Sequence, residues 1–101
     1  MKKLNTSLCE QTGISFPMIM APMFLVSNEE MIKAAIRNGI MGVFPSLNYR
    51  NEGELKTILT QLNDYRAQGG FDGSYGVNLI VQQTNLLYKK HLAICIEQKV
   101  P

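Results

Sequence analysis

Short apolar runs that alternate with amphipathic helical stretches constrain the fold of this chain more than any other sequence feature. Three such runs occur, at Met18–Ala21, Ile40–Phe44 and Tyr75–Val81, and each precedes a stretch with helical spacing. The runs are apolar with little alternation, which is typical of strands covered on both faces. Strands that alternate with helices pair in parallel through right-handed crossovers. The sequence therefore predicts an α/β fold with three parallel strands.

Polar residues mark where the first of these helices should begin and end. Ser27 and Glu30 have the spacing of a capping box, in which the hydroxyl accepts a backbone hydrogen bond and the carboxylate reaches back. We therefore expect a helix from Asn28 to about Asn38, with Ser27 as its cap. Gly39 should then supply the left-handed residue that ends the helix.

Two further helices are expected later in the chain. Asn51 and Glu54 repeat the cap spacing, and Gly69-Gly70 should close the second helix. Thr84 is the expected cap of a last helix from about Asn85 to Gln98. The apolar stripe of the second helix contains Leu55, Ile58, Leu59, Leu62 and Tyr65, and the apolar residues of the last are Leu87, Leu92, Ile94, Cys95 and Ile96.

Two architectures fit three strand–helix units: a doubly wound sheet and a (β/α)8 barrel. A doubly wound domain with only three strands would be thin, whereas a barrel needs about 250 residues. The chain has 101 residues. We therefore expect residues 1–101 to be the first three units of a TIM barrel, an incomplete N-terminal part of a single domain. Its open sheet edges would favour self-association.

Composition excludes several classes of partner. The net charge of +2 is too small to indicate a nucleic acid or an anionic membrane as partner. The basic start turns polar at once, which does not resemble a signal peptide, and the longest apolar run is interrupted by Pro17 and Pro22. A cytoplasmic location is therefore expected. Cys9 and Cys95 lie far apart, without metal-ligand spacing, and Cys95 is expected to be a buried packing residue.

The candidate ligand site lies at the carboxyl ends of the predicted strands, where parallel α/β proteins bind their ligands. Ala21, Pro22 and Met23 follow the first run, and Asn78 lies within the third. These residues include no acid–base pair, nucleophile–base pair or metal cluster. An apolar wall with one amide suits a flat, partly apolar ligand. A structural hydrogen bond is the alternative role for Asn78, and His91 is expected at the surface.

The order of these elements resembles the N-terminal part of proteins of the nitronate monooxygenase family, formerly called 2-nitropropane dioxygenase. The resemblance is carried by Phe16-Pro17-Met18-Ile19-Met20-Ala21-Pro22-Met23, by Gly39-Ile40-Met41-Gly42 and by Tyr75-Gly76-Val77-Asn78-Leu79. It covers the chain from about Leu8 to Pro101. Members of the family are FMN-dependent (β/α)8 barrels that oxidise alkyl nitronates with oxygen. The resemblance therefore implies an FMN-dependent oxidoreductase that acts on a small-molecule substrate.

The resemblance also implies roles for individual residues. Ala21, Pro22 and Met23 would line the isoalloxazine ring of FMN, and Asn78 would hydrogen-bond the flavin. The catalytic histidine and the phosphate-binding loops of the family would lie beyond Pro101, so no catalytic or metal-binding residue is expected in this segment. The chain departs from the family pattern at Phe24-Leu25-Val26 and at Phe44-Pro45-Ser46-Leu47-Asn48, where the family has glycine-rich stretches.

Two other functions remain open at the level of sequence. The first alternative is a flavin-dependent enoyl-acyl-carrier-protein reductase, because the N-terminal part of that group of enzymes is also similar to this sequence. A non-catalytic α/β module that binds a partner through its open sheet edge is the alternative from another class.

Overall fold

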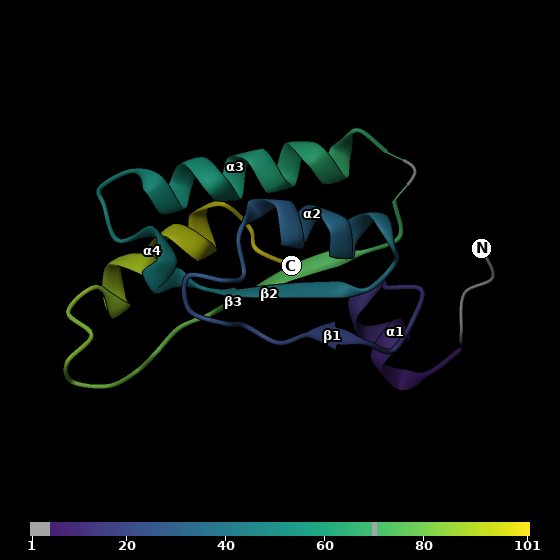
Figure 1. Ribbon diagram of the computed structural model, residues 1–101, viewed down its shortest axis with the longest axis horizontal. Coiled ribbons are helices and arrows are strands. Elements are labelled where there is room, and N and C mark those ends of the chain that lie inside the picture. Colours follow the sequence, from purple (N-terminus) through teal and green to yellow (C-terminus); the bar gives the residue numbers. More distant parts are fainter. Residues whose placement is uncertain (1–4, 70) are drawn as a thin grey trace.

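Three parallel strands form the sheet of the computed structural model, which describes residues 5–69 and 71–101, and this confirms the predicted α/β class (Figure 1). The strands are β1 (Ile19–Met20), β2 (Met41–Pro45) and β3 (Ser74–Asn78), in the order β1-β2-β3. In the register, Ile19 lies opposite Met41, and Gly42 lies opposite Tyr75. Strands that follow one another in sequence are therefore also neighbours in space.

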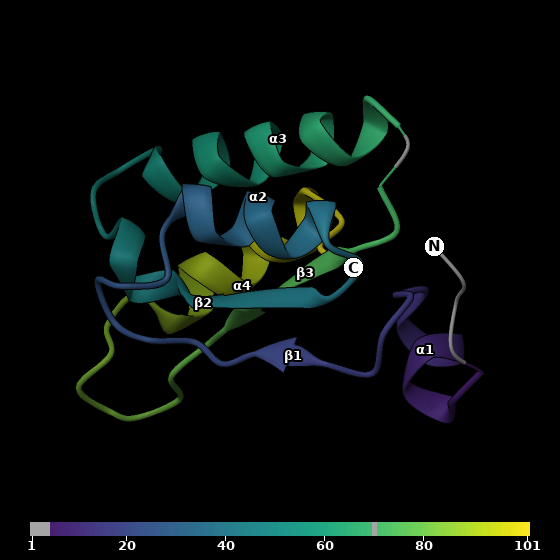
Figure 2. The ribbon, with the colours of Figure 1, turned by 45° about the vertical axis from the view of Figure 1, so that its right-hand side comes forward.

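In the part of the chain that the structure describes, four α-helices and one short 3-10 helix connect and flank the strands (Figures 1 and 2). They are α1 (Ser7–Thr12), α2 (Glu29–Arg37), the 3-10 helix η1 (Ser46–Tyr49), α3 (Glu54–Ala67) and α4 (Tyr88–Glu97). Helix α1 was not expected from the sequence; the Thr6 hydroxyl caps it by accepting the Cys9 N–H at 3.2 Å. Among the described residues, none of the helices combines the length and apolar character needed to cross a bilayer.

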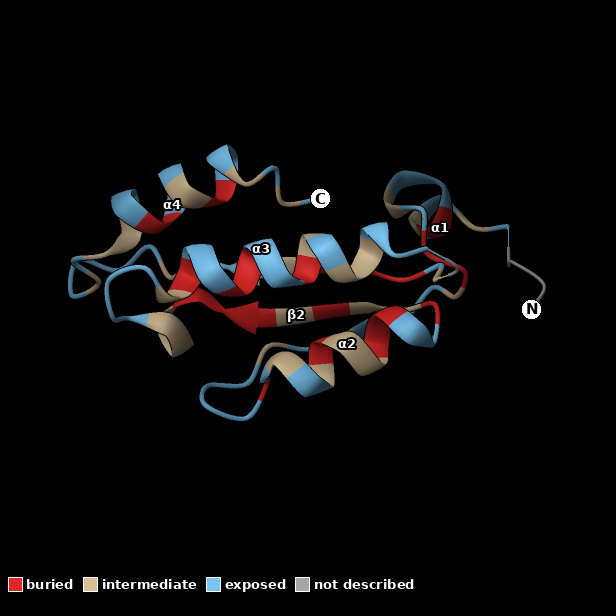
Figure 3. Ribbon diagram, turned by 90° about the horizontal axis from the view of Figure 1, so that it is seen from above, coloured by how far each residue is buried: buried red, intermediate tan, exposed pale blue. Residues whose placement is uncertain are grey.

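The core lies between the sheet and the helices that follow its strands. Figure 1 shows α2 and α3 on one side of the sheet, and Figure 3 shows buried and exposed residues alternating along both helices. Four of the five residues expected in the stripe of α3 are buried, as predicted, and Tyr65 is half-buried. The buried cluster consists of Ile32, Ile36, Phe44, Leu55, Ile58, Leu59, Leu62, Tyr75 and Cys95.

The opposite face of the sheet is less well covered. Side chains alternate between faces along a strand, so residues opposite each other in the register share a face. Gly42 and Tyr75 face α2 and α3, whereas Ile19 and Met41 share the other face. The Ile19 side chain is 48% exposed. The sequence predicted strands that are covered on both faces, but the described residues cover only one face of the sheet.

The start of α2 differs from the predicted capping box. Asn28, not Ser27, is the cap: its side chain oxygen accepts the N–H of Met31 at 3.0 Å. Ser27 is fully buried and holds the preceding loop. Its hydroxyl accepts a hydrogen bond from the N–H of Met23 and donates one to the carbonyl of Ala21. The prediction that α2 ends before a left-handed Gly39 is confirmed, since the φ of Gly39 is +77°.

Both outer strands are shorter than the apolar runs that predicted them. In β1 the ladder spans only Ile19 and Met20, with one further hydrogen bond from the Met41 N–H to the Met18 carbonyl. Strand β3 ends at Asn78, opposite Pro45. Beyond Pro45 the chain turns into η1, so within the described part of the chain the residues after Asn78 have no neighbouring strand to pair with.

The other predicted helix starts are partly wrong. Glu54 does reach back, since its carboxylate accepts the N–H of Asn51 at 3.0 Å, but Gly53 precedes α3 without a side-chain cap. Thr84 does not cap α4, which begins at Tyr88 after Leu87. The Asn85 side chain organises this turn instead, because it accepts the N–H of Leu87 and donates to the carbonyl of Ile80.

The later start of α4 changes which of its residues are buried. His91 and Cys95, one helical turn apart, face the core, whereas Leu92 and Ile96 are 36% and 70% exposed. Helix α3 ends as predicted before Gly69, whose φ is +91°. Gly70, the other residue expected to close this helix, lies outside the described residues.

Candidate functional site

The carboxyl ends of the three strands lie along one edge of the sheet, as parallel pairing requires. This edge carries the segment after β1, the helix η1 after β2 and the segment after β3, which are seen at the left of Figure 1. Ala21, Pro22 and Met23 follow β1, and Asn78 is the last residue of β3. The structure thus brings the four predicted ligand residues to one edge, with β2 between the two groups.

These four residues are accessible to solvent in different degrees. Ala21 and Asn78 are exposed, Pro22 is half-buried, and the Met23 side chain is 48% exposed. The exposed Asn78 side chain carries an amide that can both donate and accept a hydrogen bond. The edge therefore offers a thioether and a proline ring on one side of β2 and an amide on the other.

The loop between β1 and α2 is held by two polar side chains. The N–H of Leu25 donates to the Asn48 side-chain oxygen at 2.7 Å, and the Asn48 side-chain nitrogen donates to the Ser27 carbonyl at 3.1 Å. The Ser27 hydroxyl accepts the N–H of Met23 at 2.8 Å. Leu25 has a φ of +61°, a conformation that residues other than glycine rarely adopt. The loop is thus fixed in a strained shape.

This fixed loop presents apolar side chains to solvent. Met23, Phe24, Leu25 and Val26 are between 48% and 70% exposed. The guanidinium of Arg50 lies over the Phe24 ring, with its carbon atom 5.7 Å from the ring centroid. Strained backbone that carries exposed apolar groups is a feature of binding sites. Sequence reasoning missed Asn48, because its partners lie more than twenty residues away in the chain.

A buried serine–histidine pair lies behind the same edge. The Ser46 hydroxyl and the Nδ1 atom of His91 are 2.9 Å apart, and both residues are buried. The expectation that His91 lies at the surface is therefore wrong. The ring fills a core position because α4 begins at Tyr88, and Ser46 satisfies one ring nitrogen. Ser46 is fully buried, so this pair acts in packing rather than on a substrate.

The titration of His91 should be visible in the stability of the protein. Burial lowers the His91 pKa below its usual 6.5, and the nearby charge of Lys90 lowers it further. Between that lowered pKa and about 6.5, the unfolded chain binds more protons than the folded chain, so stability should rise with pH. This contribution is complete above the unfolded pKa and is lost as pH falls through the folded value.

Urea unfolding between about pH 5.5 and about pH 7.5 measures this contribution. His91 is the only histidine in the chain, so the control is His91→Gln, which keeps a polar side chain but does not titrate. We expect the pH dependence of the unfolding free energy to be flatter in the variant. Identical slopes in the two proteins would show that His91 is not the titrating group.

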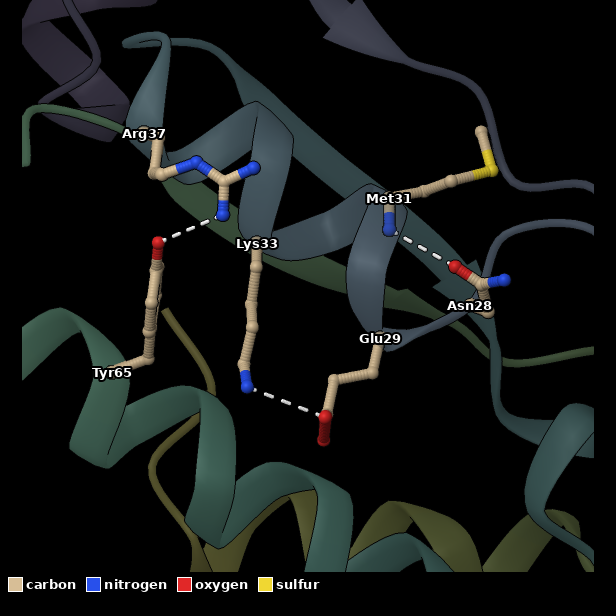
Figure 4. Close-up of polar contacts among 6 residues, drawn as sticks. All are labelled: Asn28, Glu29, Met31, Lys33, Arg37 and Tyr65. Atoms are coloured by element: carbon tan, nitrogen blue, oxygen red, sulfur yellow. Dashed lines mark hydrogen bonds and ion pairs between the residues drawn. The ribbon is translucent and has the colours of Figure 1, made fainter.

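An acidic cleft of about 440 Å³ lies on the helix side of the sheet, between the starts of α2 and α3. Burial raises the pKa of Tyr49, and the charges of Glu29 and Glu54 raise it further. Glu29 is paired with Lys33 at 3.3 Å, as Figure 4 shows. The cleft is lined by Glu29, Tyr49, Glu52, Gly53, Glu54, Thr57, Ile58 and Gln61.

The cysteines do not contribute to the ligand edge. Cys9 and Cys95 are free and buried, which agrees with the packing role expected for Cys95, and burial raises the pKa of the Cys95 thiol. Within residues 5–69 and 71–101, no group of three or more metal-ligating side chains is found.

Comparison with models of protein families, with curated proteins and with solved structures finds no match to this chain.

Proposed function

We propose that this chain is the flavin-facing N-terminal part of an FMN-dependent oxidoreductase of the nitronate monooxygenase type, with a (β/α)8 barrel as its complete fold. The observation that carries the proposal is the exposed edge on which Pro22 and Met23 flank one side of β2 and Asn78 the other. The protein would act in the cytoplasm on a small-molecule substrate.

The sheet topology is compatible with the first units of a barrel. In a barrel, each strand pairs with the strand that follows it in sequence, and all crossover helices lie on the outer face. The strand order here is β1-β2-β3, and α2, α3 and α4 contribute to one buried cluster. One half of a doubly wound sheet has the same strand order with its helices on one face, so the choice of a barrel rests on the resemblance.

The edge residues fit the ring part of FMN. A flat aromatic ring needs an apolar surface and a few polar groups at its rim. Met23 offers a half-exposed thioether, and the Asn78 side chain is exposed at the end of β3. Gly76, two residues before Asn78 on the same face of β3, has no side chain to obstruct a ring. The fit concerns the ring, because the resemblance places the phosphate-binding loops outside this segment.

When bound, the flavin supplies the redox chemistry, taking electrons from the nitronate and passing them to oxygen. The residues of this chain would orient and shield it. Pro22 and Met23 would pack against the ring and exclude water from that side. The Asn78 amide would hydrogen-bond a polar atom at the ring edge and so fix the rotation of the ring.

The protein purified from its native source tests this proposal. It should carry the absorbance of an oxidised flavin and consume oxygen when an alkyl nitronate is added without a pyridine nucleotide. A colourless protein would contradict the flavin assignment. A yellow protein that reacts only with a reduced pyridine nucleotide and an enoyl substrate would instead indicate the enoyl reductase.

In the same protein, Asn78→Leu keeps the side-chain volume but removes the amide. It should weaken FMN binding by about tenfold, as expected for the loss of one hydrogen bond in a site shielded from water. Fluorescence of released flavin measures the affinity. The control is Gln68→Leu, which removes an exposed amide at the end of α3. Equal flavin affinity in both variants would mean that Asn78 does not contact the ring.

A further inference from the structure

A small cavity of about 110 Å³ lies next to the acidic cleft, between the start of α4 and the loop that joins η1 to α3. At roughly 30 Å³ per water molecule, this volume is comparable to about four waters or to one tetrahedral oxyanion. The lining residues that bear on its chemistry are Arg50, Glu52, Gly53, Leu87, Lys90 and His91.

Two helices begin at this cavity. Figure 1 shows α3 and α4 both starting at the left, at the carboxyl edge of the sheet. Gly53 precedes α3 and Leu87 precedes α4, both line the cavity, and neither provides a side-chain cap. The Glu54 carboxylate, in the first turn of α3, accepts the N–H of Asn51 and lines the acidic cleft instead. Because the N–H groups and the dipole of a helix start attract negative charge, both helices favour an anion here.

The first turn of α4 carries charges of the sign that a helix start disfavours. It contains no acidic residue, and Lys89 and Lys90 follow Tyr88 there. Cations are unfavourable beside the positive end of the helix dipole. A sequence that breaks a local rule of helix stability is typical of functional sites. A bound anion would compensate, because it would neutralise lysine charge and accept hydrogen bonds from the helix start at the same time.

The cavity also contains a buried polar side chain, His91. This residue is 3% exposed, and its Nδ1 atom lies 2.9 Å from the Ser46 hydroxyl, so Nε2 is the ring nitrogen that can serve a ligand. The Arg50 guanidinium lies over the Phe24 ring, a contact that orients it without neutralising its charge. Among the described residues that line the cavity, Glu52 is the one carboxylate. The lining therefore carries more positive than negative charge.

We propose that this cavity binds a small tetrahedral oxyanion of the phosphate type. Lys90 and Arg50 supply the positive charge, His91 supplies a buried hydrogen-bonding group, and the start of α4 supplies backbone N–H groups. The ligand is a phosphate group, either as the free ion or as the end of a larger molecule. The proposal is independent of the flavin function, because its residues differ from those assigned to the flavin edge.

Calorimetric titration of the 101-residue chain with inorganic phosphate, at about pH 7 and a constant ionic strength of about 0.15 M, tests the proposal. We expect one site with a Kd of about 1 mM or tighter. His91 is the only histidine, so its ring signals in NMR spectra should shift with the same Kd. Glycerol 3-phosphate distinguishes the sources: equal affinity indicates the phosphate group of a larger molecule, and weaker affinity indicates the free ion. Absence of saturable binding, or binding that leaves the His91 signals unchanged, would overturn the proposal.

Two neighbouring lysines provide a matched pair of variants, and both are exposed, so the variants should fold. Lys90→Gln removes a lining charge and should raise the Kd of phosphate at least about tenfold, as expected for one charge-assisted hydrogen bond. Lys89→Gln removes the same charge from a residue outside the lining and should change the Kd by less than about twofold.

The opposing carboxylate gives a test in the other direction. Glu52→Gln removes the negative charge from the lining and should lower the Kd of phosphate about threefold. Arg50→Gln should raise it, like Lys90→Gln. Equal effects of the two lysine variants would indicate a diffuse surface field and would overturn the proposal, as would a Kd that Glu52→Gln raises or leaves unchanged.

Discussion

Replacing Gly73 by alanine should lower the free energy of unfolding by about 3 kcal/mol, because the added methyl group has no space. An ideal Cβ at Gly73 would overlap the backbone of Ile36, at its Cα, carbonyl carbon and carbonyl oxygen. The Gly73 N–H also donates to that carbonyl at 3.1 Å. A backbone cannot move aside as the tip of a flexible side chain can, so α2 and the start of β3 would have to separate.

The matched control is Gly76→Ala, which lies within β3. There the Cβ would meet the Val43 side chain at 3.5 Å and the Met41 sulfur at 3.8 Å, which are ordinary contacts. We expect its unfolding free energy to change by less than about 1 kcal/mol. Urea denaturation compares the two variants with wild type. Equal losses of unfolding free energy in the two variants would show that the backbone of Ile36 does not limit the size of the residue at position 73.

Removing the Asn48 side chain should release the loop between β1 and α2. Asn48→Ala deletes the acceptor for the Leu25 N–H and the donor to the Ser27 carbonyl, a loss of about 1.5 kcal/mol in stability. The strained φ of Leu25 is then no longer held, so the loop should leave that conformation. Limited proteolysis should cut between residues 23 and 26 much faster than in wild type.

Asn48→Asp is the informative control for this loop. The carboxylate keeps an acceptor for the Leu25 N–H but cannot donate to the Ser27 carbonyl, so cleavage should be intermediate. Mass spectrometry of the fragments identifies the site of cleavage. If Asn48→Ala and wild type are cut at the same rate, Ser27 alone determines the shape of the loop.

The sequence predicted those parts of the fold that depend on local pattern. The stripe of α3 and the left-handed Gly39 follow from spacing and from backbone sterics, and both are observed. The caps of α2 and α4 were assigned to the wrong residues, Ser27 and Thr84. At α2 the neighbouring Asn28 is the cap, whereas α4 begins without a side-chain cap and Asn85 bonds the turn before it. Two adjacent polar residues can both cap a helix, and only the rest of the fold decides between them.

The sequence predicted which residues form the candidate site, but it did not predict the tertiary contacts that hold them in place. Parallel topology alone places Ala21 to Met23 and Asn78 at one edge. Asn48 holds the loop at Leu25, and His91 is buried against Ser46. Both contacts join residues far apart in the sequence, and no spacing rule predicts them. Both tertiary partners, Ser46 and Asn48, belong to η1.

The consecutive strand order has a consequence for synthesis on the ribosome. Strand β1 leaves the ribosome first, yet its only partner within the described residues is β2, which is complete only after Pro45 has been added. Until then the apolar stretch from Phe16 to Val26 has no sheet to join. The nascent chain therefore passes through a stage in which this stretch is available to a chaperone, and the stage ends when β2 supplies the first ladder.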